Sequence, residues 1–385
     1  MLTSPAAAPF SSSLSSTAAA VWQQLWQLLP STRPPAIPVE CLSIASRTLT
    51  ELHWSVATSG TPTAFIKALP ALQHLKALGL YCVDTGAGVG SFPAPAPALQ
   101  PLSQLTRLTL QHFSISTASA QQLPGSLVEL HIGPHLDRLL QDEADSMQGS
   151  CMQPLQIQHL TRLQRLQLHS LNGCDVLPAA LTSLRVGACN ALALLPLQQL
   201  QQLHIDADAS ELLLMLLATH MQQLQEVQLT CRGTWLTPVG LKHLCMLPIT
   251  KLHVLCELPH NLLPWLGRCS HLTDLSLQLL EVDSTTQQEL AAQLVQLTSL
   301  QVLSLAVHAP TQPGLYDIAA VAVGAAWAAA MEAEAWRPVA AADMLVGAVL
   351  GLPQLRSLQL QGVVLSVEQQ LQLAGVRQLT MLKVQ

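Results

Sequence analysis

The motif most suggestive of catalysis in this sequence is Asp84-Thr85-Gly86, because an Asp-Thr-Gly carboxylate can activate water for hydrolysis. That chemistry needs two carboxylates sharing one proton, and the chain carries no second motif of this kind. A homodimer would have to supply the second carboxylate. Since the motif follows a predicted strand at the start of a loop, we interpret it as an ordinary Asp-Gly turn.

A glycine-rich stretch at the same place resembles a phosphate-binding loop, in which backbone N–H groups approach an anion closely. It lacks the Lys-Ser or Lys-Thr pair of such loops, and prolines stand where the following helix should begin. The glycines and prolines are Gly86, Gly88, Gly90, Pro93, Pro95 and Pro97. The sequence shows no nucleophile elbow, zinc-protease motif or paired carboxylates either, so we predict a non-enzymatic protein without a cofactor.

Histidines are frequent enough to raise the question of a metal site. His204 and His253 are predicted to lie two strands apart, at a separation of roughly 10 Å. Two nitrogens on one zinc ion must lie about 3 to 3.5 Å apart. The sequence therefore predicts no metal.

The nine cysteines are an odd number and include no Cys-x-x-Cys pair. Free cysteine is among the most buried residue types, so we interpret all nine as small apolar core residues in a reducing cytoplasm. They are Cys41, Cys82, Cys151, Cys174, Cys189, Cys231, Cys245, Cys256 and Cys269.

Charge and hydropathy exclude two classes of partner. The 385 residues carry a formal net charge of -6, and only 10% of them are charged. A nucleic-acid-binding surface would need clustered Lys and Arg, and no basic run occurs. The longest apolar run, Ile318 to Met331, is about 14 residues long, short of the roughly 20 needed to span a bilayer. We expect neither nucleic acid nor membrane as a partner.

A leucine pattern, L-x-x-L-x-L, organises nearly the whole chain. In each L-x-L the two leucines lie on one face of a strand and the middle residue on the other. About thirteen copies occur, mostly 18 to 30 residues apart. The clearest begin at Leu75, Leu105, Leu163, Leu272, Leu300 and Leu355, and looser ones at Leu49, Leu127, Leu181, Leu200, Leu224, Ile249 and Leu379.

On this pattern, residues 41–385 resemble the leucine-rich repeat family. The resemblance implies an α/β solenoid, with a curved parallel sheet on the concave face and helices and irregular returns on the convex face. The family places Asn or Cys three residues beyond the last strand leucine. Only Cys189 fits that position, which predicts irregular turns. The uneven spacing and the lack of a disulfide framework predict a cytosolic type with repeats of mixed length.

The segments between the strands differ in length. The stretch that starts at Ser284 predicts a helix whose Leu290, Leu294 and Leu297 share one face. Two units begin with L-P-x-x-L, at Leu123 and Leu177, and neighbouring spacings fall to 18 and 19 residues. Those spacings leave room only for extended or single-turn returns.

Two segments fall outside the pattern. Residues 1–40 form a Ser/Ala/Pro-rich leader with a predicted cap helix at 18–29, and organelle import is an alternative role for this leader. An Ala-rich insertion is predicted at about 309–348, with space for an extra helix or a degenerate repeat.

The middle residues of the L-x-L strands and their neighbours should point away from the core and line the concave face. Flanking outward positions include Glu129 and Glu226. We predict a protein-binding site at Arg165, Gln167, His169, Arg185, His204, Asp206, Gln228, Lys251, His253 and Asp274.

These features predict a monomeric, cytoplasmic scaffold that binds a protein or peptide, because concave solenoid faces are extended binding surfaces. The family resemblance offers two alternatives. One is a substrate-recognition adaptor of a ubiquitin ligase, as in F-box proteins with similar repeats. The other is a structural component of a large assembly such as a ciliary axoneme.

Overall fold

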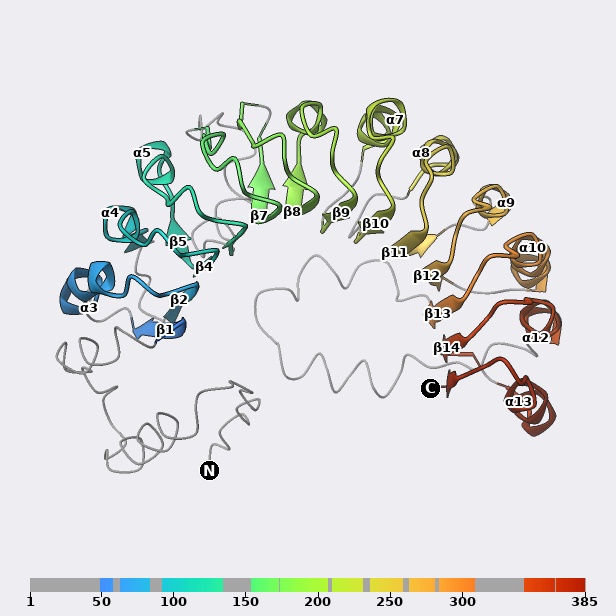
Figure 1. Cartoon of the computed structure of the whole chain (residues 1–385). Coiled ribbons are helices and arrows are strands. Elements are labelled where there is room, and N and C mark those ends of the chain that lie inside the picture. The colour runs from blue at the N-terminus through green and yellow to red at the C-terminus, as the bar shows by residue number, and fades with distance from the viewer. Residues whose placement is uncertain are drawn as a thin grey trace, which may run out of the picture.

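The computed structural model describes residues 49–57, 63–83, 92–133, 154–172, 174–206, 210–230, 236–258, 263–280, 284–308, 343–363 and 365–384. Within these ranges a thirteen-stranded, entirely parallel sheet follows chain order along an open arc (Figure 1). Its strands are β1 (Glu51–Ala57), β2 (Ala77–Val83), β4 (Arg107–Gln111), β6 (Glu129–Ile132), β7 (Arg165–Leu171), β8 (Ser183–Cys189), β9 (Gln202–Ile205), β10 (Glu226–Leu229), β11 (Lys251–Leu258), β12 (Asp274–Leu280), β13 (Val302–His308), β14 (Ser357–Gln361) and β15 (Met381–Val384).

The returns between strands lie on the outer side of the arc, whereas the strands line its inner side (Figure 1). The α-helices are α3 (Thr63–Ala68), α4 (Ala96–Leu99), α5 (Thr117–Ala120), α7 (Glu211–His220), α8 (Pro238–Leu244), α9 (Leu263–Leu266), α10 (Ser284–Leu294), α12 (Asp343–Leu350) and α13 (Val367–Ala374). Between the strands, the described residues also form two 3-10 helices, η1 (Leu69–Ala71) and η2 (Ala191–Leu194), and a two-stranded sheet of β3 (Phe92–Pro93) and β5 (Phe113–Ser114). This architecture confirms the predicted leucine-rich-repeat solenoid.

The strands form because leucines of successive repeats stack in register. Leu108 pairs with Leu130, and Leu130 pairs with Leu166, so each leucine covers the next along the sheet. All three are at most 2% exposed. One repeat alone would leave these side chains in water, and stacking therefore supplies the stability of the array.

Threonine side chains reinforce the stack where strands begin. The hydroxyls donate to the carbonyl that occupies the same position in the preceding repeat, over 2.9 to 3.2 Å. The same carbonyls also accept two backbone N–H groups from the next repeat. The donors are Thr106, Thr182, Thr250, Thr273 and Thr380.

Helix starts and repeat lengths follow the sequence closely. Ser210, Thr237 and Ser366 cap α7, α8 and α13 through their hydroxyls, which accept a backbone N–H from the first turn. The predicted helix from Ser284 is α10, on which Leu290 and Leu294 are buried. Leu297 is buried as well, but it lies beyond the end of this helix. The two repeats with spacings of 18 and 19 residues lie between β7 and β9. Apart from β8, the described residues there form only the short helix η2, as expected for spacings too short for a longer helix.

Several predicted segments lie outside the described residues. These are the leader with its cap helix, most of the Ala-rich insertion, and the Asp-Thr-Gly motif with its glycines. Residues 343–348, expected as the end of the insertion, lie in α12. No helix among the described residues is long and apolar enough to cross a membrane.

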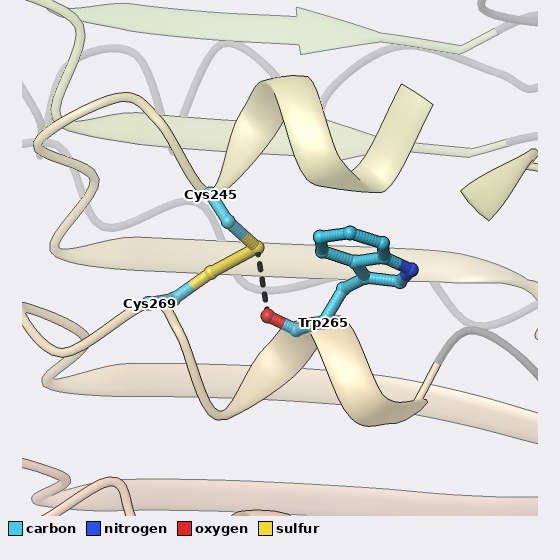
Figure 2. Close-up of a disulfide and its surroundings, with 3 residues drawn as sticks. All are labelled: Cys245, Trp265 and Cys269. Atoms are coloured by element: carbon cyan, nitrogen blue, oxygen red, sulfur yellow. Dashed lines mark hydrogen bonds between the residues drawn. A yellow bond between two sulfur atoms is a disulfide. The ribbon is translucent and has the colours of Figure 1, made fainter. Parts of the chain in front are cut away.

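The interpretation of the cysteines as free, buried apolar residues is wrong for three of them. Cys174 is exposed. Cys245 and Cys269 form a disulfide between neighbouring returns, with their Cα atoms 4.9 Å apart (Figure 2). They lie 24 residues apart, which is close to one repeat, so stacking brings them to the same place in adjacent layers.

Candidate binding surface

The concave face carries an unbroken row of side chains at the middle position of the L-x-L strands, which we name the central row. Strand pairing aligns all thirteen positions side by side, and all except Gly79 are exposed or half-buried. The row comprises His53, Gly79, Thr109, His131, Gln167, Arg185, His204, Gln228, His253, Ser276, Ser304, Gln359 and Lys383.

A second row, two residues earlier in each strand, supplies most of the charge. Glu129 on β6 is the direct lateral neighbour of Arg107 on β4 and of Arg165 on β7. Its Oε2 accepts from Arg107 Nε at 3.0 Å and from Arg165 at 2.8 Å. The three side chains make a bridge across three strands, with one more positive than negative charge.

The Glu129 pKa reflects this bridge. Partial burial raises the pKa of Glu129, but the hydrogen bonds and charges of Arg165 and Arg107 outweigh it and bring the pKa below its ordinary value of 4.5. Both guanidinium groups remain open to solvent, with side chains 55% and 54% exposed. They therefore keep free surface for a partner while Glu129 fixes their position.

His131 stands in the central row on β6, the strand of Glu129, and Arg185 stands in the same row two strands away on β8. Partial burial lowers the pKa of His131, and the nearby positive charge of Arg185 lowers it further, while Glu129 opposes the shift. Arg185 donates to Asp206, one strand away on the C-terminal side of β9, at 2.9 Å. The neutral form of His131 is thus favoured.

Glu226 on β10 is the most enclosed acid of the surface, with a side chain 18% exposed. Its carboxylate accepts from Gln202 at 3.2 Å and from Lys251 at 3.4 Å, and lies 3.2 Å from His204 Nε2. Partial burial raises the pKa of Glu226, but the contacts with His204 and Lys251 lower it below 4.5 overall. Three strands, β9, β10 and β11, thus share one carboxylate.

The remaining predicted site residues lie along the same strands. His253 Nε2 lies 3.9 Å from Asp274 on the next strand, which is an ion pair only when the histidine is protonated. Gln167 and Gln228 stand half-buried in the central row. His169 follows on β7, and a Cβ on Gly187 would collide with its carbonyl, so glycine permits the close approach of β8.

All ten predicted residues thus belong to one surface, from β7 to β12. The sequence prediction left out Arg107 and Gln202, and it named Glu129 and Glu226 as outward-facing without placing them in the site. The available signal was the strand register, because these residues stand two positions before the middle of L-x-L, as Arg165 and Lys251 do. Among the described residues, no cluster of three His, Cys, Asp or Glu side chains is suited to a metal ion.

No protein-family model matches the chain, and no curated protein matches it. Among solved structures, it is similar to an internalin (inlF) from Listeria monocytogenes, with 15% identity over 96% of this chain and 90% of that chain and a TM-score of 0.40. It is also similar to the leucine-rich-repeat ectodomain of the receptor kinase GASSHO1/SCHENGEN3 from Arabidopsis thaliana, solved in complex with CASPARIAN STRIP INTEGRITY FACTOR 2. There the identity is 14%, over 90% of this chain and 39% of that chain, with a TM-score of 0.34. The fold assignment rests on the chain's own parallel sheet and leucine pattern.

Proposed function

We propose that this chain is a non-catalytic interaction scaffold that binds a protein or peptide along the concave surface from β7 to β12. The observation that carries the proposal is the continuity of the central row, which offers one polar or small side chain per strand without interruption. An extended partner can contact many such side chains at once, and a rigid solenoid holds them in place before binding.

The charges of this surface suit a partner with both acidic and basic groups. Exposed ion pairs contribute only about 0 to 1 kcal/mol each, so a partner can replace them at small cost. Arg185 remains 47% exposed and Lys251 48% exposed while paired. These two side chains can exchange their present acids for acids of the partner.

The test is capture of the partner from native extract by the full chain. Arg185→Glu and Lys251→Glu, combined with His204→Ala, should abolish recovery of the proteins that the unaltered chain retains. A matched control reverses two exposed charges on convex helices, with Glu289→Lys and Glu368→Lys, and should keep full recovery. Equal recovery by the folded concave variant would remove this surface from consideration.

The identity of the captured proteins also tests the other parts of the proposal. Recovery of ubiquitin-ligase core components would make the chain an adaptor, and retention in a detergent-resistant skeleton would make it a component of an assembly such as an axoneme. The scaffold that we propose is cytoplasmic and monomeric. It should therefore fractionate with cytosol and elute as one chain of 41.3 kDa.

A further inference from the structure

The disulfide between Cys245 and Cys269 connects two consecutive returns on the convex side of the array (Figure 2). Cys245 is the C-cap residue of α8, and Cys269 follows the end of α9. Cys269 is 7% exposed, while Cys245 is half-buried. Cys245 is therefore the more exposed residue of the pair.

The fold does not depend on this bond. Strands β10, β11 and β12 already join the same repeats through the parallel ladder. Beneath the two cysteines, Leu241, Leu244 and Leu272 are 0% exposed and belong to the continuous core. The array can therefore keep its structure with the cysteines reduced.

The reduced state has a hydrogen-bond partner in place. Cys245 Sγ lies 3.1 Å from the backbone carbonyl of Trp265, as the dashed line in Figure 2 shows. A thiol donates to that oxygen, whereas a disulfide sulfur has no hydrogen to donate. The Trp265 carbonyl can therefore accept from the Cys245 thiol once the disulfide opens.

Two cations lie beside the ring of Trp265, the residue whose backbone carbonyl contacts Cys245. Lys242 Nζ lies 5.7 Å from the centre of the Trp265 ring, and the Arg268 guanidinium lies 4.4 Å from it. The thiolate is the reactive form of cysteine in disulfide exchange. Burial raises the pKa of Cys189 to about 12 and keeps it protonated, so Cys189 serves as an unreactive control cysteine.

We propose that Cys245 and Cys269 form a reversible redox site that exchanges with small-molecule disulfides of the glutathione class. In the first step, the Cys245 thiolate attacks one sulfur of glutathione disulfide, a mixed disulfide forms, and one glutathione thiolate leaves. In the second step, the Cys269 thiolate attacks Cys245 Sγ and displaces the second glutathione thiolate. Two protein thiols are oxidised to one disulfide, one glutathione disulfide is reduced to two thiols, and the two protons released by the protein end on glutathione.

The test uses the full chain, first reduced and then incubated folded with glutathione disulfide. Alkylation and peptide mapping should show a Cys245–Cys269 link without retained glutathione, and dithiothreitol should open the link while circular dichroism stays unchanged. Closure should raise the Tm by about 3 to 8 °C, because the bond restricts the unfolded chain. Cys269→Ser should trap glutathione on Cys245 as a stable mixed disulfide, and Cys189→Ser should leave closure unchanged.

Three outcomes would overturn the proposal. The first is glutathione retained on either cysteine of the unaltered chain without closure. The second is a link that dithiothreitol opens only when the protein unfolds, which would make it a structural disulfide. The third is loss of the folded circular dichroism spectrum on reduction of the unaltered chain, a measurement that does not depend on whether any serine variant folds.

Discussion

At the scale of single residues, the concave surface depends on carboxylates that are shared between strands. Glu226 and Glu129 each contact polar or charged side chains of both neighbouring strands, so these side chains are held in place before any partner arrives. Fixed side chains lose less conformational entropy on binding. Replacing such an acid should affect both stability and binding.

Glu226→Ala should lower the free energy of unfolding by about 1 to 2 kcal/mol, because the enclosed carboxylate gathers three polar contacts from two strands. The lowered pKa of Glu226 means that this contribution is present above pH 4.5 and is lost as pH falls below that value. Urea unfolding at pH 7 measures the effect. Glu289→Ala, at an exposed position on α10, should change stability by less than about 0.5 kcal/mol; equal effects of the two substitutions would contradict the proposed role of Glu226.

His131 should make the array sensitive to mild acid. Its pKa is lowered in the folded chain, so below pH 6.5 the unfolded chain takes up a proton first and the folded state loses stability. The urea midpoint should therefore fall between pH 7.5 and pH 5.5 by more in the unaltered chain than in His131→Gln. An identical fall in both proteins would show that His131 makes no contribution.

The residues of this surface could be predicted from alternation, but their contacts could not. L-x-L alone states that Arg165 and Lys251 point away from the core, and the structure places both there. Which carboxylate each cation meets depends on the lateral register and on side-chain conformation. The contacts of Glu129 with two arginines therefore follow from the pairing of β6 with β4 and β7, which the alternation pattern does not give.

At the scale of elements, hydrogen bonds from threonine hydroxyls join neighbouring repeats, and the leucine pattern alone does not predict them. The hydroxyl position follows the first leucine of the pattern, as in Leu272-Thr273-Asp274-Leu275. Helical segments such as α10 could be predicted, because a long spacing between strands with leucines on one face is typical of a helix. A short motif such as Cys-x-x-Cys cannot reveal the Cys245–Cys269 pairing, because stacking brings together residues that lie one repeat apart in the sequence.

Thr273→Val should lower stability by about 0.5 to 1.5 kcal/mol, because valine keeps the shape of threonine but cannot donate to the Thr250 carbonyl at 3.0 Å. Thr298→Val provides the control, since Thr298 is exposed and should tolerate the change. Thermal or urea unfolding compares the two. A loss at position 298 equal to that at 273 would assign the effect to valine itself.

At the scale of the whole molecule, the stacked layers make stability a property of neighbouring repeats and leave the inner face as one extended surface. Leu252 on β11 is 0% exposed, while His253 beside it belongs to the central row. The same strand thus contributes one residue to the core and the next to the proposed binding surface. Such alternation along thirteen strands assigns the concave side to binding in our proposal.

The most direct measurement of this central claim is site-specific photo-crosslinking in native extract. A benzophenone side chain at Gln228, in the middle of the central row, should give a covalent adduct with the captured partner. The same group at Gln288, exposed on convex helix α10, should give none. Adducts from Gln288 and none from Gln228 would contradict binding on the concave surface.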